Sequence, residues 1–161
     1  MNPRRFTTKG ELCHRKWLSS ILDIPFRTNG GIDLANEDIG IELKCRYKKY
    51  NHQFTVHEYQ LNRFQEENPG KKLYWAFLLY DLKKQPDRIG NANCIENAVS
   101  NREVWFFEWN WIKQFPVSHP KTGPYVYIKE KFFPPPEYLD KFEAKGGTLY
   151  LPKNIELEAK N

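Results

Sequence analysis

Residues 31–44 alternate apolar and polar side chains on both sides of a short polar break, which is the pattern of a half-buried β-hairpin. A two-residue turn at 37–38 would pair Asn36 with Ile39, Ala35 with Gly40, Leu34 with Ile41, Asp33 with Glu42 and Ile32 with Leu43. One face of this hairpin is then apolar and is predicted to join the core; it carries Ile32, Leu34, Ile41, Leu43, Cys45 and Tyr47. A shift of one residue would turn the whole apolar set to solvent, so this pattern constrains the fold strongly.

The polar face of the hairpin carries two acids and a lysine. Asp33 faces Glu42, and Lys44 follows about 7 Å further along the same side of the strand. Two carboxylates directly across a strand pair repel each other, and a hard divalent cation such as Mg²⁺ removes the repulsion by binding both. A neighbouring lysine can orient or deprotonate a metal-bound water, so the three residues predict metal-assisted phosphodiester hydrolysis. The alternative is a slipped turn or a bulge at Gly40, because residues 37–38 lack the Asn-Gly or Asp-Gly sequence of the favoured hairpin turns.

Length and composition exclude several classes of protein. The 161 residues suit one domain with a substantial core, and the residues after 116 could form an appendage. No apolar run reaches transmembrane length and residues 1–5 lack the apolar stretch of a signal peptide, so the protein is expected in the cytoplasm of its own cell or, for a viral protein, of the host. The cysteines and histidines fit no zinc or disulfide pattern, and there is no Gly-rich phosphate loop or nucleophile elbow.

Basic residues crowd around the acidic pair. The net charge is +5, and much of the positive charge lies in the first fifty residues: Arg4, Arg5, Lys9, Arg15, Lys16, Arg27, Lys44, Arg46, Lys48 and Lys49. Cations around a metal-binding acid pair are suited to a polyanion such as DNA. The alternative is an ordinary solvated basic face.

Two capping-box patterns predict helices on either side of the hairpin. The first opens at Lys9 and predicts a helix to Asp23, with Glu11, His14 and Arg15 on one face that could look toward the acids. Glu11 can instead satisfy the helix start. The second pattern predicts a helix from about Thr55 to Glu67, on which Gln60 could bond a phosphate or a water near the metal, or simply be solvated.

Later segments supply the rest of the expected sheet. Residues 73–80 are nearly continuously apolar and predict a central strand, residues 81–102 a long loop, and residues 104–109 a further strand. Beyond Pro116 we expect a strand over 125–129, a short helix over 137–142 and a strand over 148–151.

In this order of helix, hairpin with Asp33 and Glu42-Leu43-Lys44, helix and strand, the chain resembles the PD-(D/E)xK nuclease superfamily. Within it, residues 1–115 are most similar to archaeal-type Holliday junction resolvases. The similarity rests on Lys9-Gly10 with Arg15 and Leu18, on Ile32-Asp33-Leu34, on Ile41-Glu42-Leu43-Lys44 and on Trp105-Phe106-Phe107-Glu108. The chain departs from the family at the first helix, where His14 stands in place of a glutamate and Glu11, one turn earlier, could substitute.

The resemblance implies an α/β fold with a restriction-endonuclease-like αβββαβ core, a mixed central sheet flanked by helices, and a C-terminal β/α extension over 116–161 packed on the same domain. It also implies a homodimeric, Mg²⁺-dependent endonuclease of DNA recombination and repair, able to use Mn²⁺, that nicks four-way junctions symmetrically. Asp33, Glu42 and the Leu43 carbonyl would hold the metal, with Lys44 and Glu11 catalytic. DNA would be gripped by Lys9, Arg15, Arg27, Arg46, Lys48, Lys49 and Gln60.

Two alternatives stay open. The chain could be a type II restriction enzyme or another phage or repair nuclease of the same superfamily, reading bases through loops in the unmatched segment after Pro116. It could also be a non-catalytic nucleic-acid-binding module in which the acid pair has no chemical role.

Overall fold

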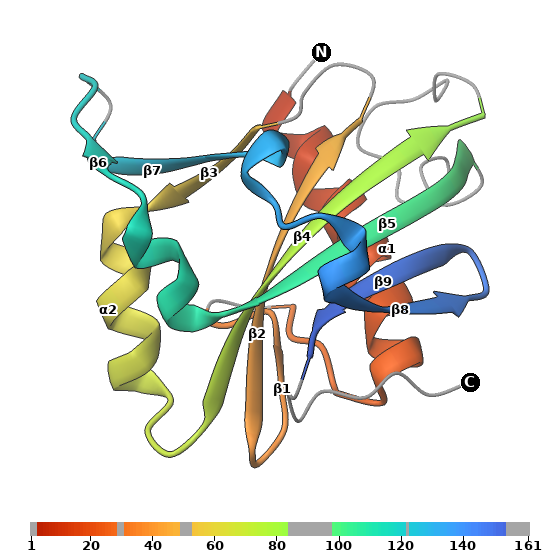
Figure 1. The fold of residues 1–161 in the computed structure, drawn as a ribbon, viewed down its shortest axis with the longest axis horizontal. Helices are drawn as coiled ribbons and strands as arrows, with labels where there is room; N and C mark the ends of the chain where they lie inside the picture. Colours follow the sequence, from red (N-terminus) through yellow and green to blue (C-terminus); the bar gives the residue numbers. More distant parts are fainter. Residues whose placement is uncertain (1–2, 29–30, 49–52, 84–97, 122, 154–161) are drawn as a thin grey trace.

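The computed structural model describes residues 3–28, 31–48, 53–83, 98–121 and 123–153, with side chains from Glu11 onward. They form an α/β structure in which two sheets and two α-helices pack together (Figure 1). The larger sheet has the strand order β1-β2-β4-β5-β9-β8 and is mixed, because β2 with β4 and β5 with β9 are parallel while the other neighbours are antiparallel. Its strands are β1 (Leu34–Ala35), β2 (Ile39–Tyr47), β4 (Lys72–Leu82), β5 (Val99–Glu108), β8 (Leu139–Ala144) and β9 (Gly147–Pro152).

The smaller sheet is antiparallel and lies beside the larger one, at the upper left of Figure 1. Its strands, in spatial order, are β3 (Gln53–His57), β7 (Tyr125–Lys129) and β6 (Val117–Ser118). The helices are α1 (Pro3–Leu22), α2 (Glu58–Glu67) and three short 3₁₀ turns, η1 (Trp109–Gln114), η2 (Glu130–Phe132) and η3 (Pro136–Tyr138). No helix among the described residues is both long enough and apolar enough to cross a membrane.

The hairpin has the predicted register. Leu34 pairs with Ile41 and Ala35 with Gly40 in an antiparallel ladder. The turn contains no glycine, and the Asn36 side chain stabilises it instead. Asn36 Oδ1 accepts hydrogen bonds from the backbone N–H groups of Asp38 at 2.9 Å and Ile39 at 2.8 Å. The Asn36 N–H donates in turn to the Ile39 carbonyl at 3.0 Å. An asparagine before the turn thus replaces the Asn-Gly sequence that hairpins usually need.

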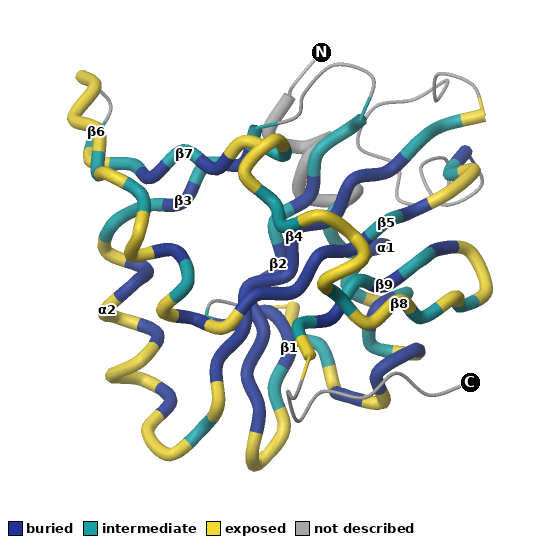
Figure 2. Tube along the Cα trace, in the orientation of Figure 1, coloured by how far each residue is buried: buried dark blue, intermediate teal, exposed yellow. Residues whose placement is uncertain are grey.

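Two apolar clusters fill the two faces of the large sheet (Figure 2). One joins α1 to the β2 side chains Ile41, Leu43 and Cys45, as predicted for that face of the hairpin. The other joins α2 and the small sheet to Trp75, Phe77 and their neighbours. Ile32 belongs to this second cluster, so its predicted place beside Leu34 is wrong. The pairing of β1 with β2 ends at Leu34. Side chains before Leu34 therefore need not alternate between the two faces of the sheet.

Three predicted elements differ from the structure, and in two of them a segment predicted to be helical pairs as a strand instead. Helix α1 begins at Pro3, well before Lys9. The segment 53–57 is strand β3, paired with β7, and the second helix begins only at Glu58. The segment 137–142, predicted to be helical, is η3 followed by β8, which forms a hairpin with β9. Residues 84–97 of the predicted long loop lie outside the described residues.

Residues after Pro116 add strands to both sheets. Strand β9 pairs in parallel with β5, and β7 pairs with β3 across the front of the large sheet. The first six elements follow the order α1, β1, β2, β3, α2, β4.

Candidate active site

The short strand β1 leaves the edge of β2 open where the acids lie. Beyond the Leu34–Ile41 pair the ladder ends, and the Asp33 side chain takes over: its Oδ2 accepts the Leu43 N–H at 2.8 Å. This bond fixes the Asp33 carboxylate directly beside Glu42 on the strand edge. The two acids are both buried, with 6% and 5% of their surface exposed. The structure therefore brings together the acid pair that the hairpin pattern predicted.

Glu42 is the least satisfied of the buried acids. Its Oε2 is 3.5 Å from Lys44 Nζ and 3.4 Å from Gln60 Nε2, while its Oε1 is buried with no hydrogen-bond partner in the described part of the chain. Burial raises the pKa of Glu42 well above its ordinary value, and the neighbouring Asp33 carboxylate raises it further. The positive charges of Lys44 and Arg15 lower this pKa and offset only part of the rise.

Gln60 is part of the candidate site, although its sequence suggested a solvated residue or a DNA contact. It projects from α2, is 8% exposed, and accepts a 3.0 Å hydrogen bond from Lys44 Nζ through its Oε1. Its amide therefore bridges the lysine and the acid of the same strand. Both ends of its amide are engaged inside the site, and its predicted contact with DNA or with a water near the metal stays a prediction. The nearby Leu61 and Phe64 place this side of α2 against the sheet, and that spacing is a signal available in the sequence.

Helix α1 brings Arg15 and Glu11 to the acids from the other side. Arg15 forms a 2.8 Å ion pair with Asp33 Oδ1 and also donates to the Arg27 carbonyl at 3.0 Å. Arg15 therefore contacts a buried acid in this structure, and its predicted contact with DNA phosphates stays a prediction. Glu11 lies 3.9 Å from Arg15, and its pKa is raised by burial and then by the Asp33 charge. Glu11 does not cap the helix, because α1 begins two turns earlier at Pro3.

His14 points away from the acids, contrary to the predicted shared face with Glu11. It is 1% exposed, accepts a 2.9 Å hydrogen bond from Arg102 Nε through Nδ1, and lies 4.5 Å from the Tyr80 ring. Burial, followed by the Arg102 charge, lowers its pKa well below the ordinary value. Of the two first-helix candidates, Glu11 is therefore the one beside Asp33.

Of the other residues predicted to contact DNA, Arg27, Arg46 and Lys48 have side chains that the structure describes. Arg46 donates to the carbonyl oxygens of Gln53 at 3.2 Å and Cys45 at 2.8 Å. Lys48 forms an ion pair with Glu103, and Arg27 is exposed. Lys9 belongs to α1, but its side chain lies outside the described part, as does Lys49 entirely.

The residues present fit a divalent cation. Asp33 Oδ1 already contacts Arg15, and Asp33 Oδ2 accepts the Leu43 N–H. Among the described residues, no three Asp, Glu, His or Cys side chains form a group that could hold a metal ion. A carboxylate nevertheless accepts more than one bond at each oxygen, and Glu42 Oε1 is buried without any. Hard cations prefer such oxygens, and a cation would relieve the repulsion that raises the Glu42 pKa.

Comparisons with known protein families, with curated proteins and with solved structures found no match to this chain. The assignment of a function therefore depends on the geometry and chemistry of the residues themselves.

Proposed function

We propose that this chain is a metal-dependent DNA endonuclease of the PD-(D/E)xK type with a restriction-endonuclease-like core. The observation that carries the proposal is the buried pair Asp33 and Glu42, with Lys44 3.5 Å from Glu42 and one Glu42 oxygen without a partner. A structural sheet gains nothing from two facing buried acids, because their repulsion opposes folding. A bound cation would remove this repulsion, which explains why the two acids lie together.

In this proposal Asp33 and Glu42 hold Mg²⁺ or Mn²⁺ together with the Leu43 carbonyl. The Leu43 N–H already points to the open edge of β2, toward Asp33. In an extended strand the N–H and carbonyl of one residue face the same neighbour, so the carbonyl is expected at that edge as well. When bound, the cation acts as a Lewis acid on the scissile phosphate and lowers the pKa of a coordinated water.

Lys44 orients the attacking water and stabilises negative charge on the phosphate. Gln60 supports this role by holding the ammonium group at 3.0 Å, which fixes a long flexible side chain in one place. Arg15 holds the Asp33 carboxylate in position, and Glu11 adds a further acid near it. The proposed substrate is a DNA junction. In this proposal a homodimer of the chain binds the junction in the cytoplasm, and each subunit nicks one strand.

Cleavage of a synthetic four-way junction tests the proposal, with a linear duplex of the same sequence as the comparison substrate. We expect the wild type to nick the junction when Mg²⁺ is present. Asp33→Asn and Lys44→Ala should each lose at least about a thousandfold in rate, equivalent to roughly 4 kcal/mol. Junction binding in EDTA should persist in both variants.

His14→Gln is the matched control on the opposite side of α1, and it should leave the cleavage rate within about threefold of wild type. Site-specific cutting of the linear duplex in preference to the junction would point to a restriction enzyme. Binding without cleavage in either Mg²⁺ or Mn²⁺ would leave a nucleic-acid-binding module.

A further inference from the structure

The outer face of the small sheet carries aromatic side chains that the core does not use. Alternate residues of β3 and β7 turn inward, where Phe54, Val56, Val126 and Ile128 join the second apolar cluster. The residues between them turn outward and are half-buried or exposed; they are Gln53, Thr55 and His57 on β3 and Tyr125, Tyr127 and Lys129 on β7. We call these six residues, together with Tyr59 at the start of α2, the outer aromatic face.

Four rings on this face form an unbroken series. Tyr59 lies 5.2 Å from His57, His57 lies 4.5 Å from Tyr125, and Tyr125 lies 6.1 Å from Tyr127. The interplanar angles are between 37° and 53°, so the rings do not cover one another's faces as a closed stack would. Tyr59 is 54% exposed, which is unusual for a large aromatic residue and typical of a recognition surface.

Strand β3, which carries part of the outer aromatic face, borders the candidate active site. Arg46, two residues after Lys44 on β2, donates from Nε to the Gln53 carbonyl at 3.2 Å. At the other end of β3, the Lys44 charge contributes to a lowered pKa of His57, after the effect of burial. Strand β3 therefore runs beside the β2 residues that follow Glu42. Its β7 neighbour adds Lys129, whose side chain is exposed.

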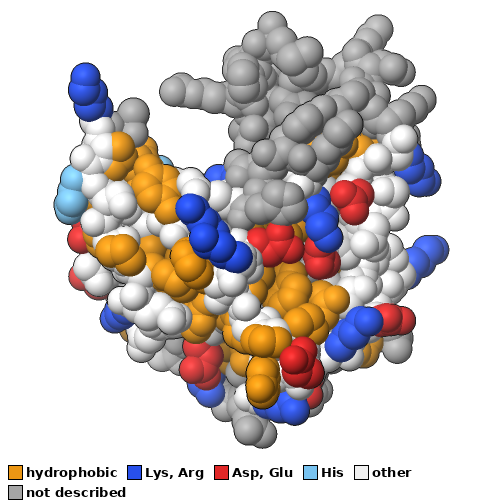
Figure 3. All heavy atoms as spheres, turned by 45° about the horizontal axis from the view of Figure 1, so that its top comes forward, with side chains coloured by type: hydrophobic (Ala, Val, Ile, Leu, Met, Phe, Trp, Pro, Cys, Tyr) orange, Lys and Arg blue, Asp and Glu red, His pale blue; other side chains and the backbone are white. Residues whose placement is uncertain are grey.

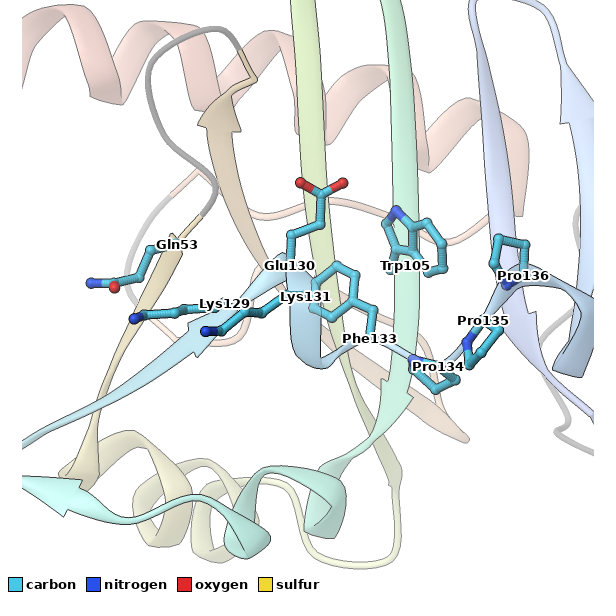
Figure 4. A pocket seen from close by; sticks show the side chains of 9 residues that line it. All are labelled: Gln53, Trp105, Lys129, Glu130, Lys131, Phe133, Pro134, Pro135 and Pro136. Atoms are coloured by element: carbon cyan, nitrogen blue, oxygen red, sulfur yellow. The ribbon is translucent and has the colours of Figure 1, made fainter.

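The face also leads into a groove with a volume of about 720 Å³, whose lining residues do not include the acid pair. Gln53 and Lys129, which are cross-strand partners, line one end of it, and Trp105, Glu130, Lys131, Phe133 and Pro134–Pro136 line the rest (Figure 4). Figure 3 shows hydrophobic side chains with Lys, Arg and acidic side chains among them on the face in view. Aromatic and apolar surface beside Lys129 and Lys131 suits a nucleic acid, and among the described residues the Glu130 carboxylate is the one acid that lines this groove.

We propose that the outer aromatic face binds an unpaired DNA strand by stacking its bases and guides that strand to the acid pair. The inference rests on the proposed nuclease function and adds to the proposed junction a second substrate, DNA with a single-stranded segment next to the cut. Bases within a duplex already stack on each other, so only unpaired bases offer faces to Tyr59, His57, Tyr125 and Tyr127. Lys129 and Lys44 supply positive charge for the phosphates at the two ends of the path.

Binding of a fluorescent oligothymidylate and of a matched duplex, measured by anisotropy in EDTA, tests this proposal without cleavage. Tyr59→Ala and Tyr127→Ala are each expected to weaken single-strand binding about tenfold and to leave duplex binding within about twofold. The Phe variants at both positions keep the ring and should bind as wild type does. Tyr138→Ala removes a still more exposed tyrosine on η3, outside the face, and is the control.

Single-strand affinity that is equal in the wild type and in both alanine variants would overturn the proposal. So would loss of wild-type self-association in Tyr59→Ala, measured by sedimentation, with oligonucleotide binding intact, because the face would then be an interface between copies of the chain. The proposed function fails separately. If the wild type cuts no DNA while the alanine variants still lose single-strand binding, the stacking surface stands and the nuclease assignment does not.

Discussion

Helix α1 contributes to two buried polar clusters, in which burial shifts the pKa values in opposite directions. The acid cluster consists of Glu11, Asp33, Glu42, Lys44 and Gln60, at the open edge of β2. The histidine–arginine cluster consists of His14, Arg102 and Trp17 on the other side of the helix, where the Arg102 guanidinium lies 4.9 Å from the Trp17 ring.

Burial favours the neutral form in both clusters, but the consequence depends on the sign of the charges. In the histidine–arginine cluster a neutral His14 accepts a hydrogen bond from a cation, and nothing further is needed for that bond. In the acid cluster the neutral form of Glu42 removes a repulsion that a bound cation would relieve better. A shifted pKa therefore marks a candidate site only where a ligand of opposite charge would reverse the shift.

The largest expected difference between the clusters is the response to metal. Mg²⁺ at about a hundred times its dissociation constant should stabilise the wild type by roughly 3 kcal/mol, seen as a higher melting temperature in the absence of DNA. Glu42→Gln should lose most of this gain because the amide cannot replace the carboxylate, whereas His14→Gln should keep it. NaCl at equal ionic strength controls for screening. Equal metal responses in Glu42→Gln and wild type would remove Glu42 from the metal site.

Arg102→Leu tests whether the histidine–arginine cluster affects the acid cluster. It leaves His14 Nδ1 buried without its donor, so we expect a loss of about 2 kcal/mol in the free energy of unfolding, measured with urea. The increase in stability on adding Mg²⁺ should remain that of the wild type. A folded Arg102→Leu protein that no longer responds to Mg²⁺ would show that the two clusters are coupled through α1.

The pH dependence of stability in EDTA should run in opposite directions for the two clusters. His14 has a lowered pKa in the folded state, so its contribution is lost as the pH falls below 6.5, the value in the unfolded chain. Burial, and then the Asp33 charge, raises the pKa of Glu42 against the lowering effect of Lys44 and Arg15, so its contribution is lost as the pH rises above 4.5. Each effect is expected to be about 1 kcal/mol or more.

Melting curves across this range for His14→Gln and Glu42→Gln separate the two contributions. His14→Gln should reduce the loss of stability as the pH falls below 6.5. Glu42→Gln should reduce the loss of stability as the pH rises above 4.5. Because Glu11 has a raised pKa as well, Glu11→Gln is the control for the acid cluster. Profiles that keep the wild-type shape in both variants would contradict the burial argument.

The acid pair could be predicted because its geometry is local. Alternation over 31–44 and one hairpin turn were enough to pair Leu34 with Ile41, and hence to place Asp33 beside Glu42. The stabilising role of Asn36 in the turn was not anticipated, but it left the register unchanged. The order of the first elements follows from similar short-range patterns.

Contacts between distant segments could not be predicted in this way. The segment 53–57 matches a helix start, yet it pairs with β7, more than sixty residues later. Glu11 and His14 are both polar residues on one helix, and only the position of Arg102 on β5 determines that His14 turns inward. Gln60 reaches the acids because α2 packs Leu61 and Phe64 against the sheet.

The sequence by itself determined the strand register, because side chains on a strand alternate with a period of two and one slipped residue would expose the apolar face. Only the tertiary structure decided which helix residues meet the acids and that the outer aromatic face lies beside Lys44. Those contacts depend on how separate elements pack against one another, and local periodicity carries no information about the partner that each face meets.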